Sequence, residues 1–225
     1  DAETPIDAAF FRRRFERAQA LRASLGLPGD DTTGYRLVHA EGDGLPGLIV
    51  DRFEDVLAVQ FGTVGMKRRQ SEVLEALASV VSPRTIVDRT SPQTAKMEGF
   101  EASSGVLQGE AVTALEVVER GLHFRVPIEL GQKTGFYFDQ RALRARVEQL
   151  ARGKRVFDTY AFVGAFAIAA ARGRAADVVA VDESAAAIEA GAACAEANGV
   201  ADRVHFVKED ARKALAGAGA SYDLV

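Results

Sequence analysis

From residue 155 to the end, the chain alternates strictly between short strand-like runs and longer runs with helical spacing. Because each strand is followed by a helix, this order is typical of a parallel sheet with helices on both faces. The C-terminal part is therefore predicted to be an α/β doubly wound sheet. Strands are expected over 155–158, 178–182, 203–207 and from 222, and helices over 165–172, 185–198 and 211–216.

The N-terminal part has a different rhythm and predicts a small α+β domain. Apolar residues at helical spacing predict a helix over 8–27, which Pro28-Gly29 ends. An antiparallel meander, a helix, a strand and a hairpin follow. We predict segments 1–33 (helix and linker), 34–129 (α+β domain) and 130–225 (parallel-sheet domain). The remaining elements are expected at 35–40, 47–51, 56–61, 66–80, 85–89, 114–118, 124–128 and 141–150.

Composition excludes several classes of protein. The 225 residues contain no apolar run long enough to span a bilayer, and the single cysteine cannot form an internal disulfide, so a cytoplasmic protein without a membrane partner is expected. A net charge of -4 argues against bulk electrostatic binding to nucleic acid. Local basic clusters at 12–14, 67–69 and 141–155 could still contact RNA phosphates, or could be solvated helix faces.

The sequence contains little information about metal binding or oligomeric state. The histidines at 39, 123 and 205 show no ligand spacing, so no metal site is predicted. The sequence leaves a homodimer open. Phe10, Phe11 and Phe15 fit a packing stripe better than a base-stacking platform.

Acidic residues follow the predicted parallel strands, where ligands bind in open α/β sheets. Asp158 ends the first strand, Asp182 could accept hydrogen bonds from ribose hydroxyls, and Asp210 could accept from an adenine amino group. Gly164 could let the backbone approach a ligand at a helix start. The alternatives are a helix cap for a strand-end acid and a simple turn for the glycine.

A nicotinamide-dependent oxidoreductase is the rival enzyme class for such a sheet. It would need a G-x-G-x-x-G turn after the first strand, where the glycines let a pyrophosphate approach. Tyr160 and Phe162 occupy that turn instead. A nucleoside without phosphate, such as S-adenosylmethionine (SAM), fits this turn better.

Three segments resemble a known family. They are GDGLPGLIVD over 42–51, GQKTGFYFDQR over 131–141 and DTYAFVGAF over 158–166. From residue 35 onward the chain is similar to class I SAM-dependent 23S rRNA cytosine-C5 methyltransferases of the large-subunit methyltransferase I type. The resemblance implies a PUA domain, a central α+β domain and a Rossmann-like methyltransferase domain, with ribosomal RNA as partner. The third segment departs from the family at two positions. The family usually has Cys or Gly where this chain has Ala161, and often has Gly where it has Ala165.

The resemblance also implies which residues hold the cofactor. The second segment is expected to fold over SAM, with Lys133 and Thr134 meeting the methionyl carboxylate and Asp139 meeting the ammonium or ordering the loop. The full set expected to bind SAM is Gln132, Lys133, Thr134, Phe136, Asp139, Asp158, Tyr160, Gly164, Asp182, Glu183 and Asp210. Within it, the resemblance assigns the methionine side to Asp158, Tyr160 and Gly164, the ribose to Asp182, the adenine to Asp210 and the adenosine edge to Glu183.

The same chemistry predicts that no catalytic residue lies in these 225 residues. Cytosine C5 is a poor nucleophile, so such enzymes add a cysteine thiolate at C6 before methyl transfer. Cys194 lies among alanines in a predicted helix and is interpreted as a packing residue. We therefore expect a C-terminally truncated, inactive fragment whose catalytic segment lies beyond residue 225. A third hypothesis is an RNA-binding module that keeps the fold without the chemistry.

Overall fold

The computed structural model describes residues 5–103, 105–130, 134–219 and 221–225. By internal contacts the chain divides into two units. Unit 1 comprises Asp1–Val117 and Gly131–Phe136, and unit 2 comprises Val118–Leu130 and Tyr137–Val225. The domain boundaries that we predicted at residues 33 and 129 remain predictions.

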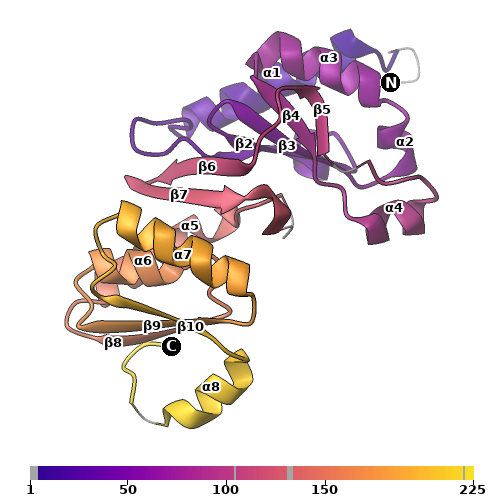
Figure 1. Cartoon of the computed structure of the whole chain (residues 1–225). Helices are drawn as coiled ribbons and strands as arrows, with labels where there is room; N and C mark the ends of the chain where they lie inside the picture. Colours follow the sequence, from indigo (N-terminus) through magenta and orange to yellow (C-terminus); the bar gives the residue numbers. More distant parts are fainter. Residues whose placement is uncertain (1–4, 104, 131–133, 220) are drawn as a thin grey trace. The chain divides into compact units, whose positions relative to one another are not determined.

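Unit 1 contains a five-stranded sheet in the order β1-β2-β3-β4-β5 (Figure 1). The first three strands form the predicted antiparallel meander, with Ile49 opposite Gln60 in its register. β3 and β4 pair in parallel, and β4 and β5 pair antiparallel. The strands are β1 (Tyr35–His39), β2 (Leu48–Phe53), β3 (Val56–Phe61), β4 (Thr85–Asp88) and β5 (Gly105–Gly109).

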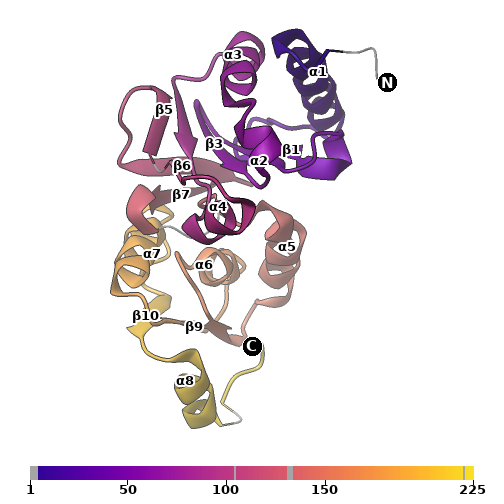
Figure 2. The same ribbon diagram turned by 90° about the vertical axis from the view of Figure 1, so that its right-hand side faces the viewer.

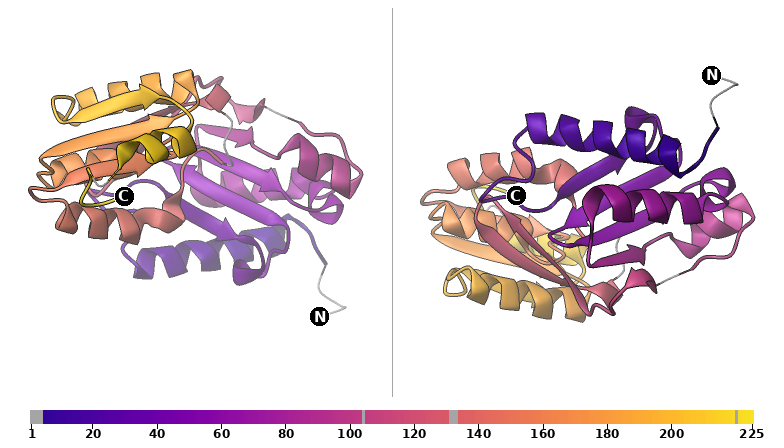
Figure 3. Two further views of the ribbon diagram at one scale, coloured as in Figure 1. Left: turned by 90° about the horizontal axis from the view of Figure 1, so that it is seen from below. Right: turned by 90° about the horizontal axis from the view of Figure 1, so that it is seen from above.

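Helices α1 (Ala8–Ser24) and α3 (Gln70–Val81) lie side by side over one face of this sheet (Figures 1 and 3). In α1 the side chains of Phe11, Phe15 and Ala18 recur at i, i+4 and i+7 and are all buried in the unit's core. The Asp7 carboxylate caps the helix by accepting from the Phe10 amide at 2.8 Å. The predicted helix is therefore confirmed, although it ends at Ser24 instead of residue 27, and it packs in the core of unit 1.

Three local features of unit 1 differ from the prediction. The helix expected over 66–80 is two helices, α2 (Val64–Lys67) and α3, because Arg68 and Arg69 separate them. Helix α4 (Pro92–Glu98), with Ser91 as its N-cap, was not predicted. Strand β5 was not predicted either, because its mostly exposed residues lack alternation and it forms only by pairing with β4.

Unit 2 contains a parallel sheet in the order β10-β9-β8, which confirms the predicted α/β winding. Helices α6 and α7 cover one face and α8 the other, and α5 lies beside α6 (Figures 1 and 2). The strand expected from residue 222 is a single bridge between Val156 and Leu224. The elements are α5 (Arg141–Leu150), β8 (Arg155–Thr159), α6 (Ala165–Arg172), β9 (Asp177–Asp182), α7 (Ala185–Ala197), β10 (Val204–Lys208) and α8 (Ala211–Ala218).

The part of the sequence that follows β5 and precedes β8 forms the predicted hairpin. β6 (Ala114–Glu119) and β7 (Leu122–Pro127) form a two-stranded sheet with Arg120 and Gly121 at its turn. Short 3-10 turns follow at Ile128–Leu130 and Phe138–Gln140. Because the strands of the parallel sheet all run the same way, the carboxyl ends of β8, β9 and β10 share one edge, and the candidate site lies there.

Candidate functional site

The turn between β8 and α6 carries an unusual backbone. Tyr160, Phe162 and Gly164 all have positive φ values, of 56°, 51° and 71°. A β carbon on Gly164 would lie 2.6 Å from the ring of Phe206. Gly164 is therefore required both for the positive φ of the backbone and for the close packing of Phe206. The sequence had left open that it only forms a simple turn.

Asp182, at the end of β9, links two of the strand ends. Its Oδ2 accepts from the Phe162 amide at 2.9 Å, and its Oδ1 accepts from the Ser184 amide at 2.9 Å. Each carboxylate oxygen has a second lone pair, so the group can still accept from a ligand hydroxyl. The Asp182 side chain is held in place by the very turn that would border a ligand.

Asp158 lies close enough to Asp182 for their charges to interact. Burial of the carboxyl group raises the pKa of Asp158 to about 7, the Ala167 amide lowers it by donating to Oδ2 at 3.1 Å, and the charge of Asp182 raises it further. The residue as a whole is half-buried and lies just before the turn. The turn thus holds two acids that repel each other.

Asp210 follows β10 and has the helix-capping role that the sequence left open for strand-end acids. Its Oδ1 accepts from the Lys213 amide at 2.9 Å and caps α8. The pKa of Asp210 is lowered chiefly by this amide and also by a hydrogen bond with Glu183. This contact joins Asp210 to the residue after Asp182. Tyr160 points outward with 70% of its surface exposed.

The loop residues of the second segment divide between the two units. Gln132 and Lys133 lie outside the described residues. Thr134 is fully buried in unit 1, where its hydroxyl donates to Asp51. A hydroxyl has one proton to donate, so in this structure Thr134 anchors the loop to β2 and has no proton left for the expected methionyl carboxylate. Phe136 is likewise buried, at 3% exposure, instead of presenting its ring to a ligand.

Tyr137, in unit 2, was missed by the sequence analysis although it lies in the quoted GQKTGFYFDQR segment. Its ring packs edge-on against Phe162 at 6.3 Å between centroids. Burial, followed by the charges of Asp139 and Asp182, raises the pKa of Tyr137. Tyr137 therefore adds an aromatic wall and a neutral hydroxyl beside the Asp182 carboxylate, while Asp139 itself is exposed.

Part of the basic cluster at 141–155 has a structural role. Arg144 is buried and makes two hydrogen bonds to buried Glu119, at 2.7 and 2.9 Å, and Arg141 pairs with the same carboxylate at 3.0 Å. Arg144 also donates to the Tyr137 carbonyl at 3.0 Å. The sequence left RNA contact and a solvated helix face as alternatives for this cluster, and Arg141 and Arg144 instead pair with Glu119 and position α5 and Tyr137.

Cys194 has the environment of a packing residue. It is 2% exposed, and its Sγ lies 3.4 Å from the Arg125 amide nitrogen. Burial raises the pKa of the thiol, which disfavours the thiolate. Within the described residues, no group of three or more His, Cys, Asp or Glu side chains is placed to hold a metal ion, and no helix is long and apolar enough to cross a membrane.

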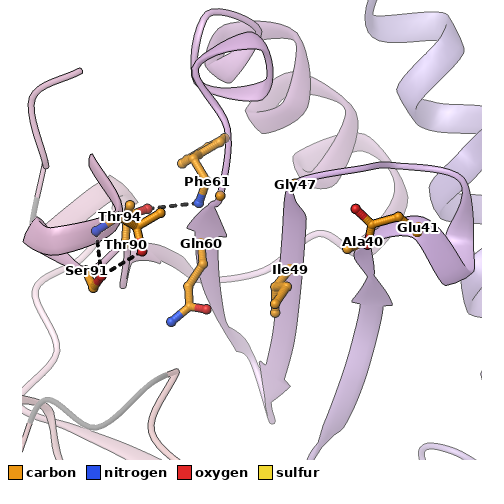
Figure 4. Close-up of a pocket in the computed structure, with 10 residues that line it drawn as sticks. Ala40, Glu41, Gly47, Ile49, Gln60, Phe61, Thr90, Ser91 and Thr94 are labelled. Atoms are coloured by element: carbon orange, nitrogen blue, oxygen red, sulfur yellow. Dashed lines mark hydrogen bonds between the residues drawn. The ribbon is translucent and has the colours of Figure 1, made fainter. Parts of the chain in front are cut away.

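A pocket of about 480 Å³ lies in unit 1, away from the predicted site residues (Figure 4). Gln60, Thr90 and Glu41 contribute its polar groups, and the Thr90 hydroxyl accepts from the Phe61 amide at 2.9 Å. None of the described residues in the predicted SAM-binding set lines it.

Sequence comparison identifies related proteins. The signature of the S-adenosylmethionine-dependent methyltransferase family matches residues 35–225. A ribosomal RNA large subunit methyltransferase I from Erwinia tasmaniensis is 37% identical over 212 residues, covering 93% of this chain and 53% of that protein. The protein of the same name from Shewanella denitrificans is 38% identical over 218 residues, covering 96% of this chain and 54% of that protein. The chain thus spans about half the length of these relatives.

Solved structures show the same fold. A Streptococcus mutans chain assigned to the SAM-dependent methyltransferases superposes with a TM-score of 0.83 at 22% identity, covering 96% of this chain and 56% of that one. A methyltransferase-assigned chain, SMU.776, solved in complex with SAH, gives a TM-score of 0.84 at 23% identity over 96% of this chain and 55% of its own. These likenesses confirm the α/β fold class with its Rossmann-like sheet.

Proposed function

This chain belongs to the family of S-adenosylmethionine-dependent methyltransferases, and from this premise we propose that it forms the SAM-binding half of a ribosomal RNA methyltransferase. We further propose C5 of a cytosine in 23S rRNA as the methyl acceptor. The substrate class is supported by the names of the relatives, and the base atom by the three sequence segments. An rRNA substrate implies a cytoplasmic protein.

The observation that carries the SAM assignment is the pair of acids at the strand ends. Asp158 and Asp182 are stabilised by backbone amides and repel each other. A ligand with positive charge relieves that repulsion and favours the ionised form of Asp158. SAM carries positive charge on its sulfonium and its ammonium group, whereas the diphosphate of a nicotinamide cofactor is an anion. The residues present therefore fit SAM.

The other strand-end residues would hold the nucleoside. Asp182 has free lone pairs for both ribose hydroxyls, and the edge-on pair of Tyr137 and Phe162 offers an apolar wall beside it. We propose that Asp210 and Glu183, which share a hydrogen bond, border the adenine. Gly164 stays in this set because its left-handed backbone shapes the turn at the start of α6.

We propose that the GQKTGFYFDQR segment adds further ligand contacts. We retain Gln132, Lys133 and Asp139 as ligand contacts and propose that Thr134 and Phe136 instead fix the segment to unit 1. Tyr160 is mostly exposed, so its contact with the methionine side remains an expectation. A homodimer also remains a prediction.

When bound, SAM supplies an electrophilic methyl group. This chain's acids and aromatic residues would orient the cofactor and exclude water from it. Addition to a cytosine ring needs a cysteine thiolate, and the one cysteine of this sequence is buried with a raised pKa. We therefore propose that these residues bind the cofactor and that the nucleophile is not among them.

Isothermal titration calorimetry with SAM tests the cofactor assignment. We expect saturable heat with the wild-type chain and at least about tenfold weaker binding for Asp182→Asn, because one hydrogen-bonding carboxylate to the ribose is lost. Asp177→Asn is the matched control, since it removes a carboxylate at the opposite end of the same strand. Thermal unfolding shows whether each variant keeps its fold.

Two outcomes would contradict the proposal. One is the absence of heat at about 1 mM SAM from a chain with a cooperative unfolding transition. The other is tighter binding of NADH than of SAM, which would favour the oxidoreductase alternative. Equal losses for Asp182→Asn and Asp177→Asn would mean that the strand ends are not the binding edge.

A further inference from the structure

Two basic clusters that are far apart in the sequence meet at one pocket of unit 1. The pocket has a volume of about 410 Å³ and is lined on several sides by Ile6, Phe10, Gly44, Pro46, Met66 and Arg69. Arg69 belongs to the cluster at 67–69. Arg14, from the cluster at 12–14, lies against the lining residue Gly44, with Nη1 3.0 Å from where a β carbon would stand. The structure thus joins two patches that the sequence left separate.

The wall of this pocket contains an aromatic ring, Phe10, that packs against the edge of the core and is only partly covered by it. Phe11 and Phe15 are buried, at 1% and 0% exposure, as expected for a packing stripe. Phe10 is only partly buried and lines the pocket. The Arg14 guanidinium lies over the Phe10 ring at 5.2 Å from its centroid. An aromatic ring and a guanidinium plane are the two side-chain surfaces on which unpaired RNA bases stack.

The charges around the pocket favour an anion. Arg13 and Arg68 are exposed, and no carboxylate of the described residues forms an ion pair with Arg13, Arg14 or Arg68. The acids nearby are each engaged. Glu72 pairs with Arg69 at 3.0 Å, Glu16 lies 3.9 Å from Arg12, and Asp7 caps α1. Glu98 accepts from the Val64 amide at 3.1 Å, and Asp43, next to the lining residue Gly44, pairs with Arg22. The guanidinium groups without a carboxylate partner among the described residues are therefore the charges that remain available to an anion.

We propose that this pocket binds one unpaired nucleotide of an RNA, with its base against Phe10 and Pro46 and its phosphates at Arg14 and Arg69. The inference rests on the proposed function for the identity of the partner as RNA. It adds a binding site in unit 1, separate from the SAM site in unit 2. An apolar wall with flanking guanidinium groups is the surface that sequence-tolerant single-strand binding requires.

The pocket of about 480 Å³ described above is a poorer candidate for this ligand (Figure 4). It is larger, but its charged lining residue is Glu41, and none of the described residues that line it is basic. A phosphate would be repelled there. The two pockets are similar in volume but differ in the charge of the residues around them. This difference in charge is the reason for assigning the nucleotide to the pocket beside α1.

Fluorescence anisotropy with a fluorescein-labelled single-stranded RNA octamer tests the proposal. We expect Arg14→Gln and Arg69→Gln each to weaken binding by about threefold to tenfold and to lower the slope of log affinity against log salt by about 1. Phe10→Leu keeps an apolar side chain and should weaken binding by about fivefold without changing the slope, because only stacking is lost.

Arg84→Gln is the matched control. It removes an exposed arginine of the same unit just before β4 and beside Asp55, at the opposite end of β3 from Thr63, which lines the pocket. We expect this variant to bind the octamer like the wild type. If Arg84→Gln loses as much affinity as Arg14→Gln and Arg69→Gln, binding is non-specific and the proposal is overturned. Wild-type affinity for both pocket variants would overturn it as well.

Two further measurements separate this inference from the proposed function. A 16-base-pair RNA duplex should bind more weakly than the single strand, and equal or tighter binding of the duplex would exclude a base-stacking pocket. SAM calorimetry on the same variants should give the wild-type affinity. If SAM does not bind any form of the chain while the RNA pattern holds, the proposed function fails and the pocket stands.

Discussion

In unit 1, buried carboxylates face cationic side chains, whereas the partly buried carboxylates that end β8 and β9 in unit 2 face backbone amides and each other. Asp51 is fully buried and receives two hydrogen bonds from Arg36, both of 2.9 Å, and Asp88 is paired with Lys67 at 3.0 Å. Asp158 and Asp182 are held by amide groups of the adjoining turns. Acids with a cationic partner serve the fold, and acids without one are available for a positively charged ligand.

The largest expected effect is on the fold of unit 1. Asp51→Asn should lower the free energy of unfolding by about 3 kcal/mol, because the Arg36 guanidinium loses its buried counterion. The Thr134 anchor weakens at the same time. Urea denaturation measures the loss. Asp55→Asn, which breaks the exposed pair with Arg84, should cost less than about 1 kcal/mol. Equal costs for the two variants would remove the distinction between buried and exposed pairs.

The next effect concerns the pH dependence of SAM binding. The pKa of Asp158 is about 7, and a cationic ligand favours its ionised form. Affinity for SAM should therefore rise by up to about fivefold between pH 6 and pH 7, and a proton should be released on binding. Calorimetry in buffers of different ionisation enthalpy measures that proton. In Asp158→Asn both effects should be absent, and if they persist Asp158 is not the group responsible.

A smaller effect concerns stability in the absence of ligand. The folded pKa of Asp158 lies above the ordinary value of 3.8, so the native state keeps a proton that the unfolded chain loses. Stability from this group is present below about pH 4 and is lost as the pH rises towards 7. Asp158→Asn should remove this loss and be more stable than the wild type at pH 8 by on the order of 1 kcal/mol. A destabilised variant at pH 8 would show that the carboxylate is compensated after all.

The smallest effect is expected at Tyr137. Tyr137→Phe keeps the ring against Phe162 but removes the hydroxyl near Asp182, so SAM affinity should fall by about twofold to threefold. Tyr222→Phe serves as the control, since that ring packs on Phe157 at 4.7 Å. Calorimetry at one pH compares the two variants. An equal response from both would separate Tyr137 from the site.

Elements with a clear pattern of apolar residues could be predicted from the sequence. The expected bounds of β3, α5 and α6 agree with the structure. α5 has a helical period, whereas β3 and α6 are nearly continuous apolar runs with defined ends. β5 could not be predicted, since its strand conformation depends on hydrogen bonds to β4. The acidic strand ends of the candidate site could also be predicted from the sequence, because parallel winding brings Asp158 and Asp182 to one edge of the sheet.

Other parts of the site depend on contacts between distant residues. Arg141 and Arg144 look like a surface cluster in the sequence, and only the buried partner Glu119 shows their structural role. Thr134 looks like a ligand contact, and only its position next to Asp51, 83 residues earlier, shows that it is an anchor. A sequence pattern gives the spacing of neighbours along a chain, not the identity of a partner across the fold.

The sequence by itself determined the order of strands and helices, the acidic strand ends and the family to which the chain belongs. Tertiary structure alone decided which of those charges are compensated and which basic clusters meet. The physical reason is that periodicity is set by local backbone geometry, whereas desolvation and ion pairing depend on groups that folding brings together. The carboxylate of Asp158 and the pocket beside Arg14 and Arg69 both belong to this second kind of property.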